Sequence, residues 1–177
     1  MAEFHQKAKL IISNPAMFMA YLSWCAAALL NRQPRLELCG NTALYYYLNF
    51  SEYWSFKNAV SKPEFAFALR MLTARNRECI AIDVGSNIGS FSCVLARAGI
   101  VHCFEPVPET FCRLQKNLEA NHLFHRCRLN CLAVGAMPGT VQLAIRQNSP
   151  ATNRIQTATE PPDSSSVTVG VITLDEY

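Results

Sequence analysis

Charged residues are scarce in this chain, and neither sign dominates. They make up 16% of the 177 residues, with 16 Lys and Arg against 13 Asp and Glu, so the net charge is +3. So small an excess gives no indication of a nucleic-acid or membrane partner. Half of the residues are hydrophobic, with only nine Pro and seven Gly, which excludes a fibrous or disordered chain. The length allows one domain with a sizeable core.

The eight cysteines include no C-x-x-C pair. Several lie within apolar runs, where a thiol behaves as a small hydrophobic side chain. We therefore expect reduced, mostly buried thiols in a cytoplasmic protein, in place of the disulfide framework of a short secreted chain. His122, His125, Cys127 and Cys131 are not spaced as the paired ligands of a structural zinc site, and no metal is predicted.

A long membrane-spanning run is also absent. Residues 16–30 are apolar apart from Ser23, and Asn14 followed by Pro15 is a typical helix start. A helix of this length rises about 22 Å, which is shorter than the roughly 30 Å hydrocarbon core of a bilayer. The favoured interpretation is a helix that packs on the body or on a partner.

A membrane-associated or exported segment is the minority alternative for residues 16–30. Lys7 and Lys9 precede the apolar run, as in a secretory signal, but the bulky Trp24 beside Cys25 argues against a lipoprotein cleavage site. Membrane association through this segment is therefore possible but not favoured.

The next residues are rich in aromatic side chains. Residues 35–54 contain them together with the turn signal Gly40-Asn41, which predicts a β-hairpin or short strands. Packing beneath the neighbouring helix is the favoured role of these rings, with substrate lining as the alternative. Residues 62–75 predict a helix. We expect an N-terminal extension over residues 1–61 and a partial α/β domain over residues 62–177.

The middle of the chain alternates strands and helices. Cys79–Val84 is a continuous apolar run, as expected of a strand buried on both faces of a parallel sheet. A helix ending at Gly99, a strand over residues 100–104, a helix from Pro108 and a third strand over residues 129–134 are predicted to follow. Parallel strands and helices that alternate with short connections imply right-handed crossovers and a doubly wound sheet. Residues 141–145 and 167–174 predict two further strands.

A glycine loop follows the first of these strands, and an acid follows the second. The loop is Gly85-Ser86-Asn87-Ile88-Gly89, and the acid is Glu105. Ligands of open α/β sheets bind beyond the carboxyl ends of the strands. Because a carboxylate there can accept hydrogen bonds from both hydroxyls of a ribose, the pattern predicts an adenosine-containing ligand.

The loop also discriminates between adenosine ligands. A dinucleotide fingerprint starting at Gly85 needs glycine at positions 87 and 90, where the chain has Asn87 and Ser90, so an NAD-dependent oxidoreductase is disfavoured. Asp83 adds a negative charge at the loop mouth, which disfavours phosphate and favours an ammonium group. A zwitterionic ligand without phosphate fits best, and S-adenosylmethionine is such a molecule.

Several motifs together resemble the FkbM family of S-adenosylmethionine-dependent methyltransferases, over about residues 63–177. They are residues 83–89, Phe104-Glu105-Pro106, Leu114 with Asn117 and Asn121, and Thr173-Leu174-Asp175. The resemblance implies a Rossmann-like class I methyltransferase fold with S-adenosylmethionine as cofactor. It further implies methyl transfer to a hydroxyl of a sugar, glycolipid or secondary metabolite.

The resemblance also implies roles by position. Gly85 and Gly89 let the loop pass under the methionine part, Asn87 fixes the loop or the ligand carboxylate, and Glu105 holds the ribose. The expected cofactor-binding residues are Asp83, Gly85, Ser86, Asn87, Gly89, Glu105, Ala133 and Val134, the last two beside the adenine. No catalytic residue is assigned, and His102 is expected to be a core or face residue.

The family continues with a K-I-D-x-E-G motif and further strands, which this sequence lacks. We therefore expect a truncated chain or a fragment that has the cofactor half and lacks the acceptor half. The strand Cys79–Val84 would then have an unpaired edge. The alternative is a non-catalytic, cofactor-binding remnant or adaptor. The expected partner is a small-molecule or glycan acceptor, and no nucleic acid is expected.

Overall fold

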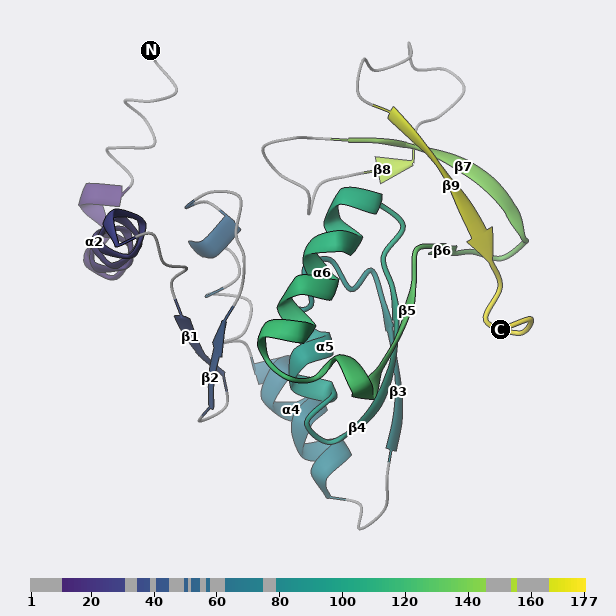
Figure 1. Cartoon of the computed structure of the whole chain (residues 1–177), viewed down its shortest axis with the longest axis horizontal. Helices are drawn as coiled ribbons and strands as arrows, with labels where there is room; N and C mark the ends of the chain where they lie inside the picture. The colour runs from purple at the N-terminus through teal and green to yellow at the C-terminus, as the bar shows by residue number, and fades with distance from the viewer. Residues whose placement is uncertain are drawn as a thin grey trace.

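The computed structural model describes residues 11–30, 35–38, 41–44, 50, 52–54, 57, 63–74, 79–145, 154–155 and 166–177. A helix and a hairpin at the N-terminal end lie to one side of an α/β unit, and a second sheet lies to the other side (Figure 1). The elements are α2 (Pro15–Leu29), β1 (Arg35–Leu38), β2 (Asn41–Leu44), α4 (Pro63–Thr73), β3 (Cys79–Val84), α5 (Ser90–Leu95), β4 (Gly99–Phe104), α6 (Pro108–Ala120), the 3₁₀ turn η1 (Phe124–Arg126), β5 (Cys127–Asn130), β6 (Ala133–Val134), β7 (Gly139–Ala144), β8 (Arg154–Ile155) and β9 (Ser166–Ile172).

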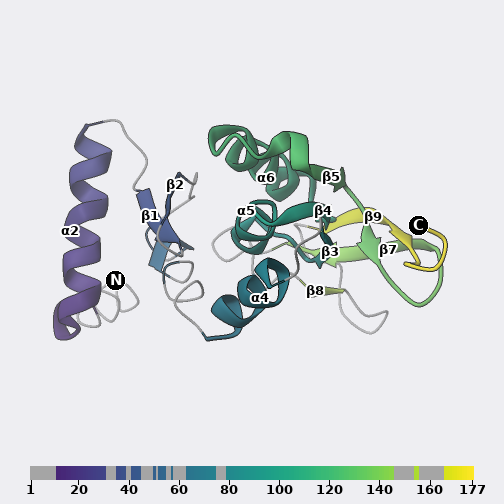
Figure 2. The ribbon, with the colours of Figure 1, turned by 90° about the horizontal axis from the view of Figure 1, so that it is seen from below.

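Strands β3, β4 and β5 form a parallel sheet in that order. Helices α4, α5 and α6 lie along one face of this sheet (Figure 2). Helices α5 and α6 each connect neighbouring parallel strands and lie on the same face, so the two crossovers have the same hand, which is right-handed in nearly all such connections. The described residues therefore confirm the predicted α/β class, with a Rossmann-like arrangement of strand, helix, strand, helix and strand.

The core of this unit lies between the sheet and the helices. Leu114 and Leu118 of α6 are one turn apart and fully buried, and they meet Val101 and Cys103 of β4 in one hydrophobic cluster. Burial of each such leucine stabilises the fold by about 1.5–3 kcal/mol. Leu114 and Leu118 therefore form the inner face of α6.

Helix α5 is shorter than the sequence predicts. It ends at Leu95, and Gly99 is the first residue of β4 and not a helix stop. A Cβ atom at Gly99 would lie 2.0 Å from the carbonyl oxygen of Cys79. This glycine is therefore required by the close approach of β4 to β3, which sequence spacing alone does not reveal.

Strand β3 is an edge strand whose side chains alternate in exposure. Ile80, Ile82 and Val84 are 71%, 50% and 53% exposed, whereas Asp83 lies on the partly buried face. The prediction that β3 is buried on both faces is therefore wrong for this structure. A run of apolar residues is compatible with burial on both faces of a strand. Within the described part of the chain, however, no helix covers the face of β3 that carries Ile80, Ile82 and Val84.

The third predicted strand is divided into two. Strand β5 ends at Asn130, and Ala133–Val134 belongs to a second sheet with the strand order β6-β9-β7-β8. This sheet has its own small core of Val107, Leu143 and Val169. The two further strands predicted near the C-terminal end are confirmed as β7 and β9.

The N-terminal elements follow the sequence prediction closely. The Asn14 side chain accepts a hydrogen bond from the backbone N–H of Met17 at 3.0 Å and so caps α2. Strands β1 and β2 pair antiparallel as the predicted hairpin. The rings of Trp24, Phe50 and Tyr53 contact one another beside α2, which agrees with the packing role. Residues 45–49 lie outside the described residues.

Seven cysteines are described, and all of them are free thiols. Cys93, Cys103 and Cys127 are buried as expected, but Cys112 and Cys131 are exposed. The expectation of mostly buried thiols is thus correct for three of the seven described cysteines. Within the described part of the chain, no helix has both the length and the apolar character needed to cross a membrane.

Candidate cofactor site

The glycine loop and Glu105 meet at the carboxyl ends of the parallel strands. Val84 at the end of β3 pairs with Phe104 at the end of β4, so the residues that follow both strands start at the same level. The backbone N–H groups of Gly85 and Ser86 donate to the carbonyl oxygen of Phe104 at 2.9 and 3.0 Å. The structure therefore brings the glycine loop and Glu105 together, as the sequence predicts.

Glu105 is nearly buried, with 6% of its surface exposed. Its Oε2 accepts the backbone N–H of Asn87 at 2.9 Å, and its Oε1 accepts the backbone N–H of Val107 at 3.0 Å. The carboxylate thus holds the glycine loop against the start of α6. Because each carboxylate oxygen has two acceptor positions, both oxygens can still accept a hydrogen bond from a ligand.

The loop backbone enters the left-handed region at Gly85 (φ +77°), Asn87 (φ +51°) and Gly89 (φ +94°). A Cβ atom at Gly89 would lie 2.8 Å from the Leu114 side chain, whereas one at Gly85 would meet no atom within 4 Å. Gly89 is therefore required by packing. Gly85 borders open space.

Asn87 carries a buried side-chain oxygen, Oδ1, for which the described residues provide no hydrogen-bond donor. A buried polar atom without a partner costs about 1–3 kcal/mol. This acceptor can take a hydrogen bond from an N–H or O–H donor of a ligand. An ammonium group fits this requirement, as does a hydroxyl.

Asp83 lies on the α5 side of β3. Its Oδ2 accepts the hydroxyl of Ser92 at 2.6 Å, and its backbone oxygen accepts the hydroxyl of Ser86 at 2.8 Å. Asp83 therefore ties β3 to the loop and to α5. The role of facing the ligand ammonium remains a prediction. Sequence reasoning missed Ser92, although a hydroxyl in the first turn of a helix beside a strand-end acid is a usable signal.

Both carboxylic acids of the site have raised pKa values. Burial raises the pKa of Asp83, and the hydrogen bonds from Ser92 and Ser86 oppose it. Burial also raises the pKa of Glu105, and the N–H groups of Val107 and Asn87 together with the charge of Arg113 oppose it. A cationic ligand would favour the ionised form of both acids.

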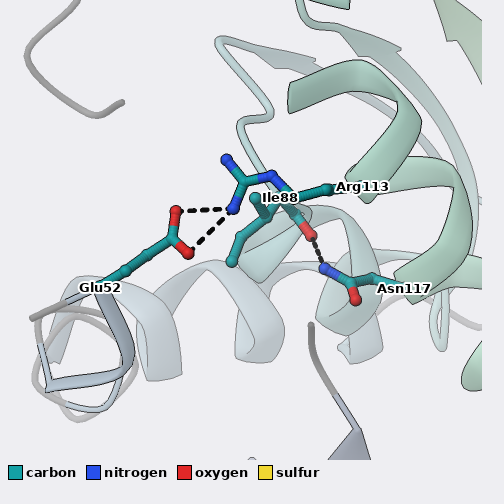
Figure 3. A network of polar contacts seen from close by, with 4 residues as sticks. All are labelled: Glu52, Ile88, Arg113 and Asn117. Carbon is teal, nitrogen blue, oxygen red and sulfur yellow. Dashed lines mark hydrogen bonds and ion pairs between the residues drawn. The ribbon is translucent and has the colours of Figure 1, made fainter. Parts of the chain in front are cut away.

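Two residues of α6 make polar contacts near the site, Asn117 with the glycine loop and Arg113 with Glu52 (Figure 3). Asn117 is fully buried, and its Nδ2 donates to the carbonyl oxygen of Ile88 at 2.7 Å. Nη1 of Arg113 lies 2.9 Å from both carboxylate oxygens of Glu52. Sequence reasoning identified Asn117 through the resemblance but missed the ion pair, because its partners are 61 positions apart and share no motif.

Ala133 and Val134 are not at the end of the third parallel strand. They pair with Val171 and Ile172 of β9 in the second sheet. The end of β5 is Asn130, whose carbonyl oxygen accepts the backbone N–H of Glu105 at 3.1 Å. Asn130 is therefore the β5 residue beside Glu105, and a contact of Ala133 and Val134 with adenine remains a prediction.

His102 of β4 and Cys131 after β5 differ in their distance from Glu105. Cys131 lies beside it, since its Sγ donates to the carbonyl oxygen of Pro106 at 3.9 Å. Nδ1 of His102 lies 2.7 Å from the hydroxyl of Tyr177, which also accepts a hydrogen bond from Asn130. His102 is thus a residue of the sheet face, as expected. Among the described residues, no three His, Cys, Asp or Glu side chains are grouped as a metal site would require.

The chain is similar to one curated methyltransferase over half its length. It is 32% identical over 88 residues to the hexuronic acid methyltransferase AglP of Haloferax volcanii, a match that covers 49% of this chain and 36% of AglP. The chain thus spans about a third of that relative. No protein-family model matches it, so membership of the FkbM family remains a prediction, as does the expectation of a truncated chain.

Two solved structures are also similar to this chain. One is the S-adenosylmethionine-dependent methyltransferase from Agrobacterium tumefaciens, with 18% identity over 56% of this chain and 32% of that one, at a TM-score of 0.43. The other is TYW2 of M. jannaschii in complex with AdoMet, with 17% identity over 55% of this chain and 42% of that one, at a TM-score of 0.37. Structural similarities with TM-scores below 0.5 say nothing about the function of this chain.

Proposed function

We propose that this chain binds S-adenosylmethionine at the glycine loop and serves methyl transfer. The observation that carries the proposal is the pairing of the loop with the buried carboxylate of Glu105, which is joined to it by the Asn87 N–H at 2.9 Å. The relative identified by sequence is a methyltransferase, which agrees with this choice of ligand.

The residues of the site match the chemical groups of this ligand. Glu105 can accept the two ribose hydroxyls, since each of its oxygens keeps a second acceptor position. The unpartnered Oδ1 of Asn87 can accept an N–H from the ligand ammonium. Residues 83–89 include one carboxylate and no cation, which suits a ligand without phosphate.

Bound S-adenosylmethionine would supply an electrophilic methyl group on a sulfonium. The contribution of this chain is to orient that ligand through the loop and Glu105, since positioning is the main part of catalysis in such a transfer. We propose a sugar as acceptor because AglP is named as a hexuronic acid methyltransferase, and we propose one of its hydroxyls because the FkbM resemblance implies hydroxyl methylation. The absence of a nucleic-acid partner and a cytoplasmic location remain predictions.

Calorimetry of the full chain with S-adenosylmethionine, its demethylated product and NAD tests the ligand. We expect the first two to bind and NAD not to bind.

The variant Glu105→Gln tests the role of the carboxylate. It keeps the shape of the side chain and removes its charge, so it should weaken the binding of S-adenosylmethionine about 10- to 100-fold, as for loss of charge-assisted hydrogen bonds. The control is Glu109→Gln at an exposed acid of the same region, which should leave affinity unchanged.

The pH dependence of binding is a second readout. Because burial raises the pKa of Glu105 and of Asp83, the ligand-free protein keeps their protons to a higher pH than a free acid would. Affinity for the cationic ligand should therefore rise as the pH rises through the raised pKa values of these two acids. The rise should be less steep in Glu105→Gln, which lacks one of them. Preferential binding of NAD, or a Glu105→Gln variant with undiminished affinity, would contradict the proposal.

Turnover distinguishes an enzyme from a binding module. Transfer of labelled methyl groups to uronic-acid-containing glycans by the wild-type chain, and not by Glu105→Gln, is expected of the methyltransferase. Ligand binding without transfer to any sugar would favour the non-catalytic alternative.

A further inference from the structure

Helix α2 has two apolar faces, and the described residues pack against only one of them. Ala20, Trp24 and Ala27 recur at helical spacing and face the body, with Ala20 buried in the main hydrophobic cluster. Large apolar side chains recur at the same spacing on the opposite face and are exposed. They are Ile12, which precedes α2, then Phe18, Met19, Leu22 and Leu29 within it, and Leu30, which follows it at the C-cap; Met19 is 63% and Leu29 88% exposed. We call these six residues the outer stripe.

An exposed apolar stripe of this kind marks an interaction surface. The sequence around it is free of acids and flanked by bases at both ends. Between residues 4 and 36 the chain has no Asp or Glu, and it has Lys7 and Lys9 before the stripe and Arg32 and Arg35 after it. An uncharged apolar surface with cations at both ends is complementary to an anionic lipid surface.

We propose that the outer stripe of α2 docks on the surface of an anionic lipid bilayer. The helix lies in the plane of the headgroups, because its 15 residues are too short to span the hydrocarbon core. The outer stripe enters the acyl boundary and the flanking bases contact anionic headgroups. This inference is independent of the proposed ligand, because no residue of the outer stripe belongs to the glycine-loop site.

Charge argues against a second copy of this chain as the occupant. A helix with cations at both ends brings like charges together when it packs against its own copy, whether the two run parallel or antiparallel. The bilayer surface supplies the opposite charge at both ends. The packed face of α2 stays on the body throughout, so docking requires no unfolding.

Flotation of the purified full chain with lipid vesicles tests the proposal. Vesicles of phosphatidylcholine with phosphatidylserine should carry the protein, and vesicles of phosphatidylcholine alone should carry much less. The double variant Met19→Glu/Leu22→Glu should reduce the bound fraction at least about tenfold, since it places two charges in the acyl boundary. Added salt should also release the protein.

The matched control is Met137→Glu, which alters an exposed methionine outside α2 and should leave vesicle binding unchanged. Unchanged melting of the double variant shows that the fold is kept. Absence of vesicle binding, equal binding to neutral vesicles, or undiminished binding of the double variant would overturn the proposal. So would a lipid-free dimer in sedimentation that the double variant abolishes, because the outer stripe would then bind a second copy.

Discussion

At the scale of single residues, the two loop glycines have different reasons to be glycine. Both have positive φ, but a Cβ atom at Gly89 would also lie 2.8 Å from Leu114 Cδ1, while one at Gly85 would lie in open space. Gly89 is thus required by backbone conformation and by packing together. Gly85 is required by conformation alone, and a role in admitting the ligand remains a prediction.

We expect Gly89→Ala to lower the free energy of unfolding by about 2–3 kcal/mol, from left-handed strain and the contact with Leu114. The matched variant Gly85→Ala should cost only about 1 kcal/mol, from strain alone, yet weaken S-adenosylmethionine because its methyl group enters the ligand side. Urea unfolding and calorimetry measure the two effects. Equal losses of stability would show that Leu114 moves aside freely.

At the scale of the elements, the two faces of β3 differ in how they are covered. Its inner face packs toward α5 through Asp83, and its outer face carries three exposed apolar side chains. The sequence shows a uniformly apolar strand, and only the arrangement of the helices makes the two faces different. An exposed apolar edge strand is also an aggregation hazard.

The same substitution at two valines tests this difference between faces. Val84→Thr on the outer face of β3 should change the free energy of unfolding by no more than about 0.5 kcal/mol. Val101→Thr, fully buried in β4, should cost about 1–3 kcal/mol because its hydroxyl is desolvated. Thermal unfolding of both variants compares them. A comparable loss at Val84 would mean that the outer face of β3 is covered in solution.

At the scale of the whole molecule, the ion pair of Glu52 and Arg113 joins the predicted N-terminal extension to the α/β unit. Glu52 and Arg113 are each only 11% exposed, and their closest atoms are 2.9 Å apart. Arg113 also acts on the site, since its charge opposes the rise in the pKa of Glu105. The extension is therefore coupled to the loop region through α6 (Figure 3).

A double-mutant cycle with Glu52→Gln and Arg113→Met measures this coupling. We expect each single variant to lose about 2 kcal/mol or more of stability, because one buried charge is left without its partner, and the double variant to lose less than the sum. Glu109→Gln at an exposed acid serves as the control and should change stability little. Strictly additive losses would show that the pair contributes no coupling.

The sequence by itself determined the local elements and the site that links them. Asn14 caps α2, buried leucines define the inner face of α6, and a glycine loop and an acid follow consecutive strands, because these patterns depend on residues close together in the chain. Only the tertiary structure decided which face of β3 is covered, that Ala133–Val134 joins a second sheet, and that Glu52 meets Arg113. Each of these depends on how distant segments pack, and packing between distant segments leaves no periodic signal in the sequence.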